Sequence, residues 1–127
     1  MYKIFFYEDR KGYSELREQI KELARRSQNS KDSRIQLRQI TYVIGLLEER
    51  GTRLPESITK YIGNDIWELR PGDNRILYFY SKNDLFVLLH MFRKKTQKTP
   101  RLEIERARRE RLDFQARMEE ELYEKLG

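Results

Sequence analysis

The stretch IWELRPGDNRILYFYSKNDLFVLLHMFRKKTQKTP, residues 66–100, decides the fold. It contains three apolar runs of strand length, separated by Pro-Gly-Asp-Asn and by Ser-Lys-Asn-Asp, which are residue types that favour tight turns. Pro71 fixes its own φ, and Gly72 is free to adopt a positive φ. The pattern predicts an antiparallel meander with strands at about 66–70, 75–81 and 85–93.

The elements before the meander are expected to be one strand and two helices. An apolar run predicts a strand at 2–7. Ser14 is the expected N-cap of a first helix. A second helix is expected from about 34 to 50, and Gly51 lies where a C-cap glycine belongs. We expect a loop between this helix and the meander.

After the meander, Pro100 is expected to start a long C-terminal helix with Thr99 as its N-cap. The element order is therefore β-α-α-β-β-β-α. These patterns predict a single α+β domain over residues 1–127. In it, a helical hairpin covers one face of a small, mostly antiparallel sheet.

Composition excludes several classes of site. The chain has no cysteine and one histidine, which argues against disulfides, thiolate chemistry and histidine-built metal sites. A metal site of that kind is not expected, and we expect no other cofactor. No run approaches the ~20 apolar residues of a membrane span, and the N-terminus does not resemble a signal peptide. The expected location is the cytoplasm, without a membrane partner.

The positive charge is confined to one segment. The net charge is +6, and residues 93–111 hold nine Lys and Arg against three Glu, so the rest of the chain is close to neutral. Such a run can be a solvated helix face, but one-sided positive charge also suits nucleic acid. The candidate binding residues are Arg93, Lys94, Lys95, Lys98, Arg108 and Arg111.

Two arginines flank the first turn of the meander. If the strands pair symmetrically, Arg70 lies opposite Arg75, with Glu68 on the same face. Opposed like charges destabilise a hairpin unless an anion lies between them, so removing either should be neutral or mildly stabilising. The arginines can splay into water, or they can clamp a phosphate with their planar guanidinium groups.

His90 and Tyr78 are further candidates for proton transfer. In regular alternation, His90 would share a strand face with Phe86, Leu88 and Phe92. A histidine among apolar neighbours is more often a hydrogen-bonded core residue than a catalyst. Tyr78 is expected to point to the face opposite to Leu77, and most strand tyrosines are also simple packing residues.

Four segments resemble one known family: WELRP, RILYFY, VLLHMFRKKTQKTP and EIERARRERLDF. They are similar to the phage-derived, HigB-like branch of the RelE/ParE toxin superfamily. The resemblance implies a toxin of a type II toxin–antitoxin system that cuts mRNA on the ribosome without a metal. It implies that Arg70 and Arg75 bind the phosphate, with Glu68, His90 or Tyr78 as base or acid.

Two other activities stay open at this level. ParE-like relatives poison DNA gyrase, and a non-catalytic protein that binds RNA or the ribosome would need the same charge. The resemblance also implies a cognate antitoxin with a helix-turn-helix domain, through which the toxin would reach promoter DNA.

Overall fold

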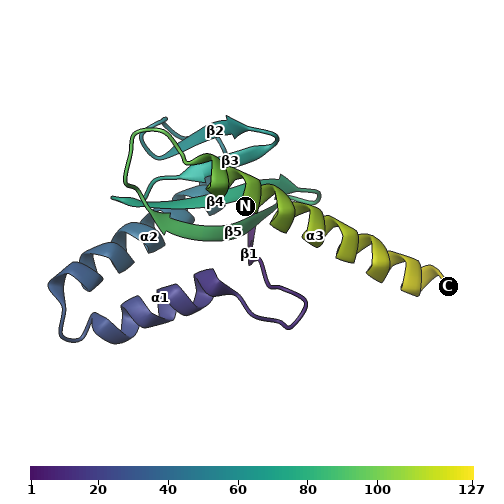
Figure 1. Ribbon diagram of the computed structural model, residues 1–127, viewed down its shortest axis with the longest axis horizontal. Helices are drawn as coiled ribbons and strands as arrows, with labels where there is room; N and C mark the ends of the chain where they lie inside the picture. The colour runs from purple at the N-terminus through teal and green to yellow at the C-terminus, as the bar shows by residue number, and fades with distance from the viewer.

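The computed structural model describes residues 1–127 and forms three layers (Figure 1). Helices α1 and α2 cover one face of a five-stranded sheet, and α3 crosses the other face. This arrangement confirms the predicted α+β class. The elements are β1 (Lys3–Phe6), α1 (Glu15–Arg26), α2 (Lys31–Arg50), β2 (Thr59–Gly63), β3 (Ile66–Leu69), β4 (Asn74–Ser81), β5 (Leu85–Arg93) and α3 (Arg101–Leu126).

The strand order in the sheet is β1-β5-β4-β3-β2, and the sheet is mostly antiparallel, as predicted. Only β1 runs parallel to its neighbour, β5. The central strands β4 and β5 are buried on both faces, which is why they read as continuous apolar runs. No helix has the length and apolar content that crossing a membrane would need.

Each face of the sheet has its own hydrophobic core. Under α1 and α2, the core includes Leu16, Ile40 and Leu47 packed on Tyr78 and Phe86. Under α3, a second core is built from Ile66, Leu77, Phe79, Val87, Leu89, Ala107 and Phe114. The predicted alternation along β4 is therefore confirmed, because its odd and even positions face different helices.

The N-terminal helices begin at serine caps. The Ser14 side chain accepts a hydrogen bond from the Arg17 backbone N–H at 3.1 Å, which confirms the predicted cap of α1. α2 begins at Lys31, earlier than expected, because the Ser30 side chain caps the Ser33 N–H at 3.2 Å.

β2 is an additional strand where a loop was expected, so the predicted element order lacked one strand. It pairs antiparallel with β3 and lies at the sheet edge, where Lys60 and Tyr61 are exposed. Asn64 and Asp65 both have positive φ (55° and 61°), which is the conformation of a tight two-residue hairpin turn. A short edge strand has little apolar periodicity, and for that reason the sequence pattern did not reveal it.

A β-bulge in β5 overturns the predicted position of His90. Leu77 pairs with His90 but Tyr78 pairs with Leu88, so Leu89 is an extra residue without a partner. Beyond the bulge the alternation is shifted by one residue. His90 therefore faces α3, on the side of the sheet opposite to Phe86 and Leu88.

The loop after β1 fixes the middle of α3. The Tyr7 hydroxyl donates to the Asp113 carboxylate at 2.6 Å, and Arg117 donates to Asp113 at 2.8 Å and to the backbone carbonyl of Glu8. Burial raises the pKa of Asp113, but these donors outweigh burial and hold its pKa below the usual range. Beyond this point α3 projects from the sheet, and Leu122 is exposed (Figure 1).

Candidate functional site

The predicted pair of arginines does lie across the first turn of the meander, but the two side chains share a carboxylate. The register places Glu68 opposite Leu77 and brings Arg70 opposite Arg75 on the α3 side of the sheet. Arg70 Nε donates to Glu68 Oε1 at 3.1 Å, and Arg75 Nε lies 3.8 Å from the same oxygen. Glu68 is 2% exposed. The anion required between the arginines is therefore part of the protein.

Arg75 is held by the turn that precedes it. Its Nη1 donates to the backbone carbonyls of Gly72 and Asn74 at 2.7 and 2.8 Å, and its side chain is 13% exposed. Burial lowers the pKa of Arg75 from its ordinary value, and the Glu68 carboxylate opposes that change. Arg70 is more open, and its Nη1 donates to the Glu56 carbonyl at 3.0 Å. Neither arginine splays into water.

The loop between β5 and α3 closes over Glu68. Thr99 was the expected N-cap of α3, but the cap residue is Pro100, and the Thr99 hydroxyl donates to Glu68 Oε2 instead. The Lys94 backbone N–H donates to the Asp73 carbonyl at 2.8 Å, which fastens the loop to the turn. The remaining cavity beside Glu68 has a volume of about 10 Å³. This space holds about one water molecule and no phosphate group.

Tyr78 is not part of this cluster. It is fully buried in the core under α1 and α2, and its hydroxyl lies 2.7 Å from Thr59 Oγ1. Burial raises the pKa of Tyr78 well above its ordinary value, which the hydrogen bond to Thr59 only partly offsets. The sequence offered Tyr78 as an acid or base, but the tyrosine lies on the opposite face of the sheet from Glu68 and cannot act beside it.

His90 is a buried, hydrogen-bonded residue rather than an open one. Its Nδ1 lies 2.5 Å from Glu110 Oε1, and its Nε2 lies 3.2 Å from Glu103 Oε1. Arg106 approaches Glu110 at 3.5 Å and also reaches Glu15 on α1 at 2.8 Å. Both ring nitrogens are thus engaged, and His90 fastens α3 to the sheet.

The predicted cations form an exposed surface around the N-terminus of α3, with one exception. Arg93, Lys94, Lys95, Lys98, Arg108 and the additional Arg109 are exposed and have no carboxylate partner within 4.0 Å, and we call these six residues the cationic surface. Arg111 differs, because its side chain is 16% exposed and contacts the Asn64 carbonyl and Asp65. It attaches α3 to the turn after β2.

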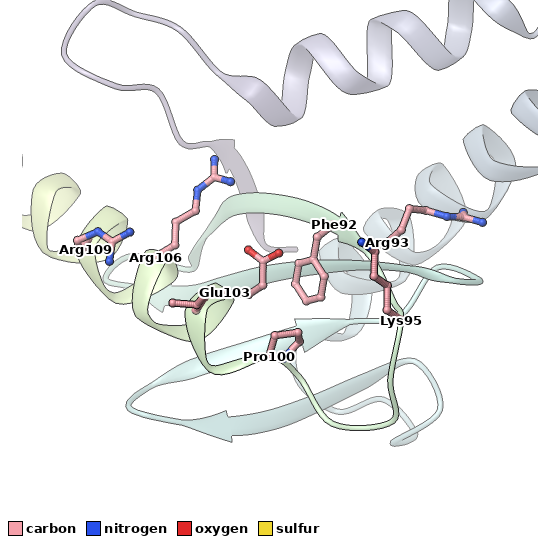
Figure 2. Close-up of a pocket in the computed structure, with 8 residues that line it drawn as sticks. Phe92, Arg93, Lys95, Pro100, Glu103, Arg106 and Arg109 are labelled. Atoms are coloured by element: carbon pink, nitrogen blue, oxygen red, sulfur yellow. The ribbon is translucent and has the colours of Figure 1, made fainter.

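Two hollows flank the start of α3. The first hollow, of about 660 Å³, is lined by Phe92, Glu103 and four cations from β5, the loop and α3: Arg93, Lys95, Arg106 and Arg109 (Figure 2). The second hollow, of about 710 Å³, includes Lys98, Arg101 and Arg108. Charge counting found the cations, but it could not show that Glu103 and Phe92 lie between them. No group of three or more acidic or histidine side chains is arranged to hold a metal ion.

The fold is RelE-like. The chain aligns with RelE in the crystal structure of the archaeal RelE–RelB complex from Pyrococcus horikoshii OT3 with a TM-score of 0.50 and 14% sequence identity. The alignment covers 74% of this chain and 96% of that one. Among curated proteins, no sequence matches this chain.

Family membership comes from the sequence itself. Residues 29–112 match the family described as phage derived protein Gp49-like (DUF891). The chain therefore belongs to the Gp49-like family, a phage-derived family of RelE/HigB-like type II toxins.

Proposed function

We propose that this Gp49-like toxin is a ribosome-dependent endoribonuclease that cuts mRNA and so stops translation. The observation that supports this most is the cationic surface, whose six side chains have no carboxylate partner. By contrast, four other arginines of α3 each have an acidic partner: Arg101, Arg106, Arg111 and Arg117. Exposed cations gathered on one side repel one another and attract a polyanion, and RNA is such a polyanion.

The chemistry would take place at the edge of this surface, beside Glu68. The 2′-oxygen of the substrate would form a bond to phosphorus as the bond from phosphorus to the 5′-oxygen breaks. A base would take the 2′-hydroxyl proton, and an acid would give a proton to the leaving 5′-oxygen. Arg70 would stabilise the charge on the phosphorane, with Arg75 behind it and Lys94 and Lys95 binding the RNA backbone.

Glu68 is the best-placed candidate base, because its carboxylate already lies between the two arginines. It is enclosed by Thr99, so RNA binding would have to displace the loop from residue 94 to 100 before Glu68 could accept a proton. His90 has both ring nitrogens engaged and is a poorer candidate.

A cognate antitoxin would neutralise the toxin in the cytoplasm. The likeness to RelE from a RelE–RelB complex supports a partner of this kind. We propose that the antitoxin carries a helix-turn-helix domain and that promoter DNA is reached only through it.

The test is mRNA cleavage by the purified chain in a translation reaction, with cut ends mapped by primer extension and a ribosome-free reaction alongside. Arg70→Ala should slow cleavage about 100-fold, which corresponds to roughly 3 kcal/mol of transition-state stabilisation. Arg38→Ala, an exposed arginine on α2, is the matched control and should cleave at the wild-type rate. Intact mRNA together with loss of DNA supercoiling would instead indicate a ParE-like inhibitor of gyrase.

A further inference from the structure

The first hollow has a composition that suits a nucleotide. Three of its cations, Arg93, Lys95 and Arg109, have no carboxylate partner and are therefore available for a phosphate. Its volume of about 660 Å³ lies within the range of about 300–1,000 Å³ that is usual for small-molecule sites. In Figure 2 these cations lie at the two ends of the hollow: Arg93 at the end of β5 and Lys95 in the loop that follows on one side, and Arg109 on α3 on the other.

An aromatic ring lies between these cations. Phe92 is the last inward-facing residue of β5, half-buried, with its ring 6.1 Å from the His90 ring. Pro100 lies nearby as part of the same wall, as Figure 2 shows. Because every nucleobase has a flat π-face, a half-exposed phenyl ring beside unpaired cations is a suitable stacking surface for a base.

A carboxylate also lines the hollow. Glu103 is on the first turn of α3, with its side chain 27% exposed, and its Oε1 lies 3.2 Å from His90 Nε2. Its Oε2 has no hydrogen-bond partner within the chain. His90 is itself fixed by Glu110 on the other side of its ring. The Glu103 carboxylate is therefore held in place beside Phe92, with one oxygen free to accept a hydrogen bond.

We propose that the first hollow binds one guanine nucleotide of the RNA, with the base stacked on Phe92 and its Watson–Crick edge on Glu103. The inference deepens the proposed nuclease function and rests on it, because it assigns a base preference to the surface that would hold the mRNA. Arg93, Lys95 and Arg109 bind the adjoining phosphates.

The carboxylate selects guanine because of the order of donors and acceptors on each base. Guanine presents N1–H and N2–H side by side. Glu103 Oε2 can accept one of these donors, and Oε1, which has a second lone pair beside its contact with His90, can accept the other. Adenine and cytosine place a ring-nitrogen acceptor next to their amino group, and uracil has an acceptor on each side of N3–H. Those acceptors would face a carboxylate oxygen and be repelled by it.

Binding of free nucleotides to the purified chain tests this without a ribosome. Guanosine 5′-monophosphate should bind about tenfold more tightly than inosine 5′-monophosphate, which differs only in lacking the 2-amino donor. Uridine 5′-monophosphate should bind more weakly still. Isothermal titration calorimetry gives the dissociation constants, and equal constants for the guanosine and inosine nucleotides would overturn the proposal.

Variants separate the contact to the Watson–Crick edge from stacking on Phe92. Glu103→Gln should remove most of the preference for the guanosine nucleotide over the inosine nucleotide. Glu119→Gln removes a carboxylate from the exposed far part of the same helix and should keep the full preference. Phe92→Leu should weaken all nucleotides to a similar extent, and Phe92→Tyr should restore binding because stacking is retained. Circular dichroism confirms that each variant is folded, and equal effects of the two Glu→Gln changes would refute the role of Glu103.

The remaining outcomes distinguish this inference from the proposed function. If the chain cuts mRNA but binds all nucleotides equally, the hollow is not a guanine site and the nuclease proposal stands. If the chain prefers the guanosine nucleotide but cuts no mRNA, the first hollow is a guanine site and the nuclease proposal fails. If nucleotides do not bind while an acidic segment of the antitoxin protects Arg93 and Arg109 from chemical modification, the hollow is a protein-binding surface and the inference is wrong.

Discussion

Replacing Arg75 with alanine should destabilise the protein by about 2–3 kcal/mol. Arg75 makes two hydrogen bonds to backbone carbonyls, at 2.7 and 2.8 Å, each with a net contribution of about 1 kcal/mol. Its loss also removes one of two cations from the buried Glu68 carboxylate. The total stays below the roughly 3–5 kcal/mol of a fully broken buried pair, because Arg70 and Thr99 remain on Glu68.

Thermal unfolding measures this effect directly. For a domain of this size, 1 kcal/mol corresponds to roughly 3–4 °C, so Tm should fall by about 8 °C. Arg101→Ala is the control, since Arg101 is 90% exposed and its pair with Glu105 should contribute less than about 0.5 kcal/mol. Adding Glu68→Gln to Arg75→Ala should recover part of the loss, because the buried group becomes neutral. The reasoning is refuted if Arg75→Ala melts like the wild type, which is the result that the sequence alone predicts.

Three further predictions follow from other contacts. Thr99→Val should cost about 1 kcal/mol by leaving a buried oxygen of Glu68 with one donor fewer, and urea unfolding would detect it. The pKa of Asp113 is lower in the folded protein, so its contribution to stability is complete above the unfolded-state pKa of about 4 and disappears as the pH falls through the folded value. Asp113→Asn should therefore flatten the dependence of Tm on pH below about 5, and an unchanged profile would contradict this. Changing Lys94, Lys95 and Lys98 together to alanine should weaken RNA binding and reduce its salt slope, whereas the same slope would exclude them from the interface.

Much of the fold could be predicted because its signals are local. The meander, the caps at Ser14 and Gly51 and the C-terminal helix depend on residues close to one another in the chain, and all are present. β2 was missed because its stability comes from pairing with β3 rather than from its own apolar pattern. A short, half-exposed edge strand carries little information about its partner.

The candidate site was only partly predictable, because which side chains meet depends on register and burial. The sequence indicated that Arg70 and Arg75 would face each other, but the shared Glu68 and the Thr99 hydroxyl depend on how the loop after β5 folds back. The sequence could not show that Tyr78 is buried on the face opposite to Glu68, where it is unavailable for proton transfer.

By itself, the sequence determined the α+β class, the location of the positive charge and membership of the Gp49-like family, since periodicity, turn residues and composition can be read along the chain. Tertiary structure alone decided the face on which His90 lies. One unpaired residue, Leu89, reverses the alternation, and that bulge arises from pairing between β4 and β5. Tertiary structure also decided that Glu103 lies beside Phe92. The two residues belong to α3 and β5, which meet only when α3 packs on the sheet.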